Sequence, residues 1–441
     1  MINIPRGEYF YMIKAWLIAL ILICQAPSVL AAATLRGVVL ENQIGGSPVK
    51  KVQVTTLGGA NQAVTGDDGQ FVLVFPKRQP GEDVSINVKH GDWVVVNAIQ
   101  LTRTLPINAM LNPLEILICK KADLNTWALQ FYRLKGQQVV DTSYERKLAE
   151  LKSSNAAGTK ELERLQRERD QARAQVEEMA RQIASHPGRG EDESYQKAMS
   201  LFLDGRMDEA LEMLSEERLR RQAEDEKKQE EGTKKKKAQN LQSWLLRGQL
   251  LALKFDFDAA ARSYGNAVKF APDSYIAWMH YSRFHNTQFN FTESTNGFEK
   301  AVSLARSSGK DGDIAASLDE LSLLYLTKEL ITKAMQANEE ALEIFKKLAS
   351  KSKTDADRHN VAMSLDIRST LYRFENRMAE ALQTSKEVLD IYKKLKLENN
   401  DFYLGHLAIF TSNLSLLYRD ENRITDALQA TKEALEIFKK L

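Results

Sequence analysis

EALEIFKKL, the sequence of residues 340–348, occurs again at 433–441, and the close variant EVLDIYKKL occupies residues 387–395. Equivalent positions in successive copies are 47 and 46 residues apart. A repeat of this length is typical of helical hairpins that stack into a solenoid, where each hairpin contacts its neighbours. Because such an array presents one long surface built from many hairpins, we expect the function of this region to reside in a surface.

The repeated pattern extends upstream of this motif. In each copy a Tyr is followed nine residues later by Ala, and seven residues after that by Ala or Val. The three sets are Tyr325, Ala334 and Ala341, then Tyr372, Ala381 and Val388, then Tyr418, Ala427 and Ala434. Antiparallel helices approach closely only where side chains are small, so these Ala positions predict the points at which paired helices cross.

A shorter period of 34 residues precedes these copies, since Trp278 follows Trp244 at that distance. Residues 241–274 carry the pattern Trp244, Gly248, Ala260, Tyr264, Ala267 and Pro272. At these positions the chain resembles the tetratricopeptide repeat (TPR) family. Residues 191–224 and 275–308 carry weaker versions of the same pattern. The resemblance implies an α-α solenoid, a TPR superhelix of about six helical hairpins spanning 191–441.

The last three repeat units resemble the longer variety found in kinesin light chains. One position departs from the pattern, because Arg368 stands where the units on either side have Leu321 and Leu414.

The TPR resemblance also implies where a partner binds. In that family the first helix of each hairpin lines a concave groove that holds peptides or helices of other proteins. The matching positions of this chain are Gln242, Gln249, Arg283, Asn286, Asp319, Asp366, Arg373, Ser412 and Arg419. The Lys and Asn pair with which some members clamp a terminal carboxylate is absent from these positions. Guanidinium groups pair well with carboxylates, so the three arginines predict an acidic partner segment.

The amino terminus resembles a secretory signal peptide over residues 1–33. Arg6 and Lys14 precede the apolar run 15–24, and small residues follow, so we expect cleavage near Ala31 or Ala33. The run is too short for a well-formed membrane span, which takes roughly 20 residues. This predicts an exported, periplasmic or secreted protein of a bacterial-type envelope, with an uncleaved inner-membrane anchor as the alternative.

Once this segment is removed, Cys119 is the only cysteine, so the mature chain forms no intrachain disulfide despite its export signal.

Residues 34–113 have the composition of a small all-β domain, with Val, Thr, Gly and Asn in short alternating runs. The expected strands are 35–40, 49–57, 70–75, 84–89 and 93–99. Gly37, Pro48, the run 52–54 and the run 64–71 resemble the carboxypeptidase regulatory-like domain, a transthyretin-like β-sandwich. That resemblance implies an adhesive or structural accessory without chemistry of its own.

Residues 114–190 are expected to form a helical connector. Apolar residues follow weak heptads, which come closest to a regular pattern over 162–183. Interruptions at Asn155, Gly158 and Arg169 favour a helical hairpin over a dimerising coiled coil. The fold class is therefore multidomain, a small β-sandwich followed by a helical connector and the solenoid.

Composition and motifs argue against two functions. The formal net charge of +2 argues against nucleic acid as the main partner. His280 and His285 are five residues apart, which does not place two imidazoles on one helical face, and Cys119 has no histidine near it in sequence. No metal, cofactor or catalytic constellation is predicted, and we expect the protein not to be an enzyme.

The leading hypothesis is a non-catalytic scaffold of the cell envelope that holds a partner peptide or helix in the groove. The sequence ends at Leu441, directly after a full motif and without a polar capping helix. Either further repeats or an effector domain follow, or this end packs against another chain. The first case makes the array the sensing or substrate-selecting arm of a larger signalling protein or enzyme, and the second predicts self-association through the last repeat.

Overall fold

The computed structural model describes residues 32–57, 61–110, 113–153, 158–185, 193–228, 234–395 and 401–439. Most of the predicted signal peptide therefore lies outside the described residues. The chain divides into two compact units, Met1–Tyr132 with Ile183–Gly188 and Arg133–Gln182 with Arg189–Leu441. Within the described ranges, no helix has both the length and the apolar character required to cross a bilayer.

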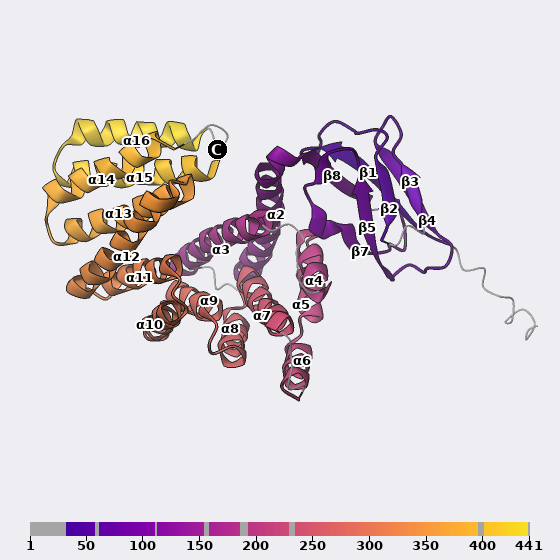
Figure 1. The fold of residues 1–441 in the computed structure, drawn as a ribbon, viewed down its shortest axis with the longest axis horizontal. Coiled ribbons are helices and arrows are strands. Elements are labelled where there is room, and N and C mark those ends of the chain that lie inside the picture. Colours follow the sequence, from indigo (N-terminus) through magenta and orange to yellow (C-terminus); the bar gives the residue numbers. More distant parts are fainter. Residues whose placement is uncertain are drawn as a thin grey trace, which may run out of the picture. The chain divides into compact units, whose positions relative to one another are not determined.

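The first unit contains two four-stranded sheets (Figure 1). One has the order β4-β1-β8-β6 and the other β3-β2-β5-β7. The strands are β1 (Ala33–Glu41), β2 (Gln53–Thr56), β3 (Gln62–Val64), β4 (Gln70–Phe75), β5 (Asp83–Lys89), β6 (Trp93–Val95), β7 (Thr102–Thr104) and β8 (Leu114–Lys120). Short 3-10 helices occupy Ala98–Leu101 and Lys121–Asp123. Leu35 and Phe71 of one sheet and Val54 of the other belong to a single buried cluster, so the unit is a β-sandwich.

Five predicted strands are present, with bounds that differ by up to four residues at either end, but the predicted boundary at residue 113 is wrong. Strand β8 follows that boundary and pairs in parallel with β1, with Gly37 opposite Leu114. The sequence LEILICK is buried at five of its seven positions, which removes the alternation that identifies a half-exposed strand. A Cβ on Gly37 would lie 2.4 Å from the Leu114 carbonyl oxygen, so this pairing requires glycine.

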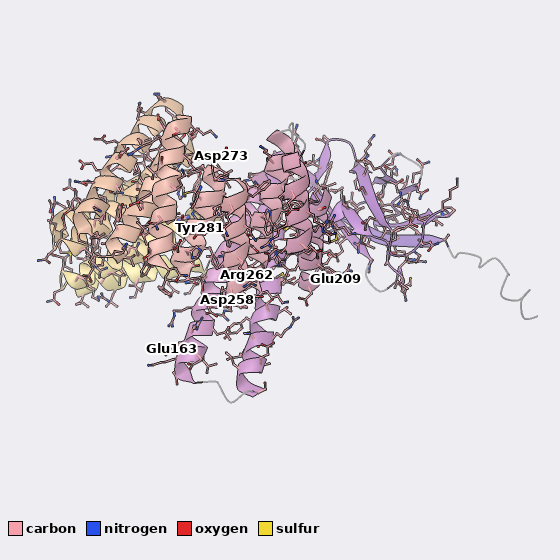
Figure 2. All side chains as sticks on the ribbon, turned by 90° about the horizontal axis from the view of Figure 1, so that it is seen from below. Glu163, Glu209, Asp258, Arg262, Asp273 and Tyr281 are labelled. Atoms are coloured by element: carbon pink, nitrogen blue, oxygen red, sulfur yellow. The ribbon has the colours of Figure 1, made fainter. Side chains whose placement is uncertain are left out.

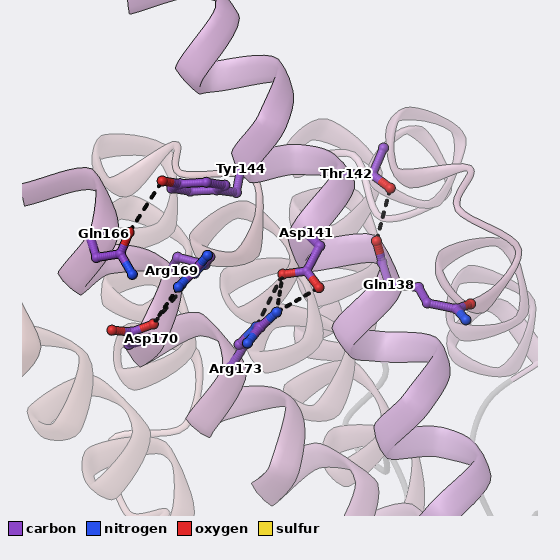
Figure 3. Close-up of polar contacts among 8 residues, drawn as sticks. All are labelled: Gln138, Asp141, Thr142, Tyr144, Gln166, Arg169, Asp170 and Arg173. Atoms are coloured by element: carbon purple, nitrogen blue, oxygen red, sulfur yellow. Dashed lines mark hydrogen bonds and ion pairs between the residues drawn. The ribbon is translucent and has the colours of Figure 1, made fainter. Parts of the chain in front are cut away.

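Two long helices follow, α2 (Leu124–Ser153) and α3 (Thr159–Ser185). The two helices pack against each other as a hairpin. Both Arg173 Nη2–Asp141 carboxylate distances are 2.7 Å (Figure 3). A Cβ on Gly136 would lie 2.5 Å from a Val176 methyl group. Glu163 lies near the turn of this hairpin (Figure 2).

Six helical hairpins make up the repeat array in the part of the chain that the structure describes. They are α4 (Glu193–Leu203) with α5 (Met207–Met213), α7 (Lys234–Leu253) with α8 (Phe257–Phe270), α9 (Tyr275–Thr287) with α10 (Phe291–Ser308), α11 (Asp311–Thr327) with α12 (Ile331–Ser352), α13 (Asp355–Phe374) with α14 (Met378–Lys393), and α15 (Asp401–Asp420) with α16 (Ile424–Phe438). An additional helix, α6 (Glu216–Lys228), follows the first hairpin.

Each hairpin turn reverses the chain through one residue with positive φ. These are Gly205, Phe255, Phe289, Glu329, Asn376 and Asn422. The amide of the next residue donates a hydrogen bond to the carbonyl five residues before it, as from Arg377 to Tyr372 and from Arg423 to Tyr418. This 6→1 bond closes the carboxyl end of the first helix, and glycine or asparagine adopts the left-handed conformation at the lowest energetic cost.

Most of the predicted crossing residues are buried, whereas Ala427 in the last hairpin is only half-buried. Ala334, Ala341 and Ala381 are all 0% exposed, and Phe298 and Tyr392 are equally buried beside them. Gly248 faces the Tyr264 ring, which a Cβ there would approach to 2.8 Å. The apolar pattern therefore sets the crossing points of the helices and leaves the remaining faces for polar groups.

Candidate partner-binding face

The predicted site residues lie on the first helices of five successive hairpins. We call the side of α9, α11, α13 and α15 on which their polar side chains meet the first-helix face. Gln242 and Gln249 on α7 and Asn286 on α9 are half-buried, and so is Ser412 on α15. The charged members show how the face is organised, because Arg283, Asp366 and Arg373 each bond a side chain on the next first helix along the array.

Arg283 on α9 is bonded across to α11. Its Nε donates to the Glu320 carboxylate at 2.7 Å, and 45% of the arginine side chain remains exposed. Burial lowers the pKa of Arg283, whereas the negative charges of Glu320 and of Glu178 on α3 raise it, with a net rise. The guanidinium is therefore charged and is held in place by an anion on the neighbouring helix.

Asp420 at the end of α15 is shared by the other two predicted arginines. Arg373 on α13 donates to it at 2.7 Å, and Arg419 donates to it at 3.0 Å. The hydrogen bond from Arg419, and then that from Arg373, lower the pKa of the Asp420 carboxyl. Arg419 is the most exposed of the three arginines, at 58% of its side chain. Each arginine is thus accessible and already balanced by a carboxylate.

Asp319 does not line an open surface, so its prediction as a groove residue is wrong. Its side chain is only 8% exposed and accepts hydrogen bonds from Asn338 Nδ2 at 3.1 Å and Ser364 Oγ at 3.0 Å. Asn338 also receives a bond from Arg368 Nε at 2.7 Å. Burial raises the pKa of Asp319 to about 7, although the two hydrogen bonds oppose the shift. The carboxyl closes the junction of three helices, α11, α12 and α13.

Asp366, the equivalent residue one repeat later, is more open and bonds along the array. It accepts from Asn413 Nδ2 at 3.1 Å, and burial raises the pKa of its carboxyl to about 6. On the same two helices His359 and His406 lie with ring centroids 4.7 Å apart. Three cross-helix contacts therefore follow one another at seven-residue steps along α13 and α15: His359 with His406, Asp366 with Asn413, and Arg373 with Asp420.

The histidine pair is held in its neutral form. Burial lowers the pKa of His359 to about 3 and that of His406 to about 4, and the charge of Arg181 on α3 contributes to both shifts. His359 Nδ1 lies 2.5 Å from the Tyr392 hydroxyl, which fixes one ring nitrogen. In the described ranges, no group of three or more His, Cys, Asp or Glu side chains is arranged to hold a metal ion.

The cross-helix partners are the part of the site that the sequence analysis missed. Glu320, Asn413 and Asp420 lie 37, 47 and 47 residues after the side chains they bind. A search for complementary polar residues about one repeat apart on first helices would have identified them. Arg368 did stand out in sequence, but only the structure shows that it belongs with Asp319 and Asn338.

Fold and site together define a protein in which a β-sandwich precedes an array of helical hairpins with a polar first-helix face. The chain matches no protein-family model and no curated protein.

Solved structures are similar to the array at low identity. BtubC (BKLC) from P. vanneervenii is 15% identical over 53% of this chain and 91% of that chain, with a TM-score of 0.43. A putative kinesin light chain with nearly identical TPR-like repeats from Podosopora anserina is 15% identical over 45% and 95%, with a TM-score of 0.36. YrrB, described as a TPR protein with an unusual peptide-binding site, is 18% identical over 44% and 84%, with a TM-score of 0.28.

Proposed function

We propose that the protein is a non-catalytic scaffold that holds a segment of a partner protein against the first-helix face. The observation that carries this proposal is the set of exposed polar side chains crossing α9 to α15, with Arg283, Arg373 and Arg419 each opposed by a carboxylate. Exposed ion pairs of this kind contribute little to stability, about 0–1 kcal/mol each. Such pairs are better explained by recognition than by folding.

An acidic segment would bind by exchange. Its carboxylates would take the places of Glu320 and Asp420 beside the arginines, so the intramolecular pairs keep the guanidinium groups oriented until the partner arrives. The polar groups between them, Asp366 with Asn413, offer hydrogen bonds to the partner backbone. The proposal therefore predicts that affinity depends on salt concentration and on both the arginines and their present partners.

We further propose that the protein acts in the cell envelope, after export directed by residues 1–33. In this setting the β-sandwich, which resembles the carboxypeptidase regulatory-like domain, would contact an envelope or extracellular component as an accessory. Fractionation of the source cells and amino-terminal sequencing of the mature protein test this location. A chain that starts near residue 32 or 34 in an exported fraction supports it, and an intact amino terminus in the cytosol contradicts it.

The binding proposal is tested by affinity capture from the envelope fraction with the full chain as bait. A variant carrying Arg283→Ala, Arg373→Ala and Arg419→Ala is compared with a matched control carrying Arg306→Ala, Arg377→Ala and Arg423→Ala. The control arginines also form ion pairs, with Glu340, Glu380 and Asp426, but they do not belong to the first-helix face. We expect the wild type and the control to retain the same partner and the first variant to lose it.

A second pair of variants tests the chemistry of the partner. Glu320→Gln and Asp420→Asn leave the arginines in place without their present anions, so an acidic partner should bind more tightly. Weaker binding of both variants would show that the partner uses these carboxylates itself, which contradicts an acidic segment. Equal capture by all baits would place the binding site outside the first-helix face and overturn the proposal.

A further inference from the structure

Helix α16 exposes a row of large apolar side chains. Ile424 is 51% exposed, Leu428 58%, Leu435 52% and Phe438 46%. The residues lie four, seven and three positions apart, so they share one face of the helix. We call these four residues the α16 stripe. Large exposed apolar rows of this kind mark interaction surfaces in soluble proteins.

The equivalent residues of the two preceding second helices are buried or half-buried. In α12 they are Ile331, Met335, Leu342 and Phe345, and in α14 they are Met378, Leu382, Leu389 and Tyr392. Phe345 is 6% exposed and Tyr392 is 0% exposed. The covering element is the first helix of the next hairpin. On α14, for example, Tyr392 lies 5.1 Å from Phe410 of α15 between ring centroids, and Leu382 shares a buried cluster with Leu414 and Leu417. The α16 stripe thus continues an interface that the chain itself uses twice.

The helix that covers α14 has a definite pattern. The α15 residues that pack there are Tyr403, Leu407, Phe410, Leu414 and Leu417, at steps of four, three, four and three. The same steps on α16 give Ile424, Leu428, Thr431, Leu435 and Phe438. Helix α16 therefore carries both the surface that accepts a covering helix and the spacing that such a helix needs. Two α16 helices are complementary to each other.

We propose that the α16 stripe binds the α16 stripe of a second copy of this chain. A surface that complements itself pairs about a twofold axis, with each residue contacting the equivalent partner patch. Around a centre at Thr431, antiparallel helices bring Ile424 of each copy to Phe438 of the other. The same geometry brings the two exposed Lys432 side chains near the axis, where their like charges oppose association. The first-helix face takes no part, so this inference is independent of the proposed function.

The test is sedimentation equilibrium of the full chain between about 1 and 100 µM, the range in which modest apolar interfaces dissociate. The face variant carries Leu428→Glu and Leu435→Glu. Its control carries Ile107→Glu and Ile276→Glu, which introduce the same charges at apolar residues that are 93% and 47% exposed elsewhere. Circular dichroism confirms that the variants fold, which their exposed positions predict.

We expect the wild type and the control to pass from monomer to dimer, and the face variant to stay monomeric. Lys432→Leu should tighten the dimer by about tenfold or more, because it removes the like charges at the axis. A monomer at every concentration overturns the proposal, and so does a dimer that survives in the face variant. Mass that rises beyond the dimer also overturns it, because that result indicates head-to-tail stacking.

Discussion

Two neighbouring junctions of the array differ in their polar chemistry, although the same apolar pattern builds both. Between α11–α12 and α13, Asp319, Asn338 and Ser364 form a buried network, and Asn338 is 0% exposed. Between α13 and α15 the charged contact is more open, because the side chains of Arg373 and Asp420 are 33% and 22% exposed. Two neighbouring repeats can therefore share the same helix crossings and still differ in the polar interactions that join them to the next repeat. We expect the first junction to serve stability and the second to serve recognition.

Removal of the Asn338 side-chain amide should give the largest difference in stability between the two junctions. Asn338→Ala deletes the group that bonds Asp319, Ser364 and Arg368, and leaves buried partners unsatisfied. We expect a loss of about 2–4 kcal/mol in the free energy of unfolding of the array, since each buried unsatisfied polar group costs about 1–3 kcal/mol. Urea unfolding followed by helical circular dichroism measures it.

Asn413→Ala is the matched change at the second junction. It removes an amide whose hydrogen bond, among the described residues, goes to the half-buried Asp366, so the loss should stay below about 1 kcal/mol. Equal losses of unfolding free energy in Asn338→Ala and Asn413→Ala would show that the buried network stabilises the array no more than the open contact does. The proposed difference between the two junctions would then be wrong.

The two junctions should also differ in how their stability depends on pH. The direction of this dependence at the first junction follows from the burial of the Asp319 carboxyl. Burial raises the pKa of Asp319 to about 7, so the folded state binds this proton more tightly than the unfolded state does. The resulting stability is fully present below the ordinary Asp pKa of about 4 and is lost as the pH rises through about 7. Asp319→Asn should remove this dependence and be more stable than the wild type at pH 8, by a few kcal/mol at most.

The equivalent substitution at the second junction, Asp366→Asn, should change the stability by a smaller amount and over a lower pH range. The pKa of Asp366 is raised only to about 6, so Asp366→Asn should flatten the stability curve between about pH 4 and 6. Urea unfolding at pH 5, 6, 7 and 8 distinguishes the two carboxyls. An Asp319→Asn variant that is less stable than the wild type at pH 8 would mean that the network needs the ionised carboxylate.

These residues also show what sequence can reveal about such a protein. Periodicity predicted the hairpins and the crossing residues Ala334 and Ala381, because close packing leaves a regular trace in the sequence. It did not distinguish Asp319 from Asp366, since both occupy the same repeat position. Their difference arises from Asn338, whose equivalent in the next repeat is Ser385, and that hydroxyl bonds Ser369 instead. Hydrogen-bond partners across helices depend on such local exchanges, which periodicity does not capture.

Arg368→Leu tests the contribution of the one arginine that departs from the repeat pattern at the first junction. Leucine is the residue at the equivalent positions 321 and 414. The change removes a guanidinium whose Nη2 is buried without a hydrogen-bond partner among the described residues, but it also deprives Asn338 of a donor. These effects oppose each other, so we expect a net change in unfolding free energy within about 1 kcal/mol.

A clearer signature of Arg368 is the titration of its neighbour. The positive charge of Arg368 lowers the pKa of Asp319, in opposition to burial, so Arg368→Leu should move the pH at which stability is lost to a higher value. A titration that stays in place would show that Arg368 does not act on the carboxyl. The control is Asp319→Asn with Arg368→Leu, in which the dependence should be absent.

The smallest effect on stability is expected at the arginine of the second junction. Arg373→Ala removes an ion pair whose side chains are 33% and 22% exposed, while Arg419 still neutralises Asp420. The loss should be less than about 1 kcal/mol and should shrink further at high salt. If this variant unfolds like the wild type but captures less partner, the pair serves recognition rather than folding. A large loss of stability would instead make the second junction structural like the first, and any loss of binding would then be a consequence of unfolding.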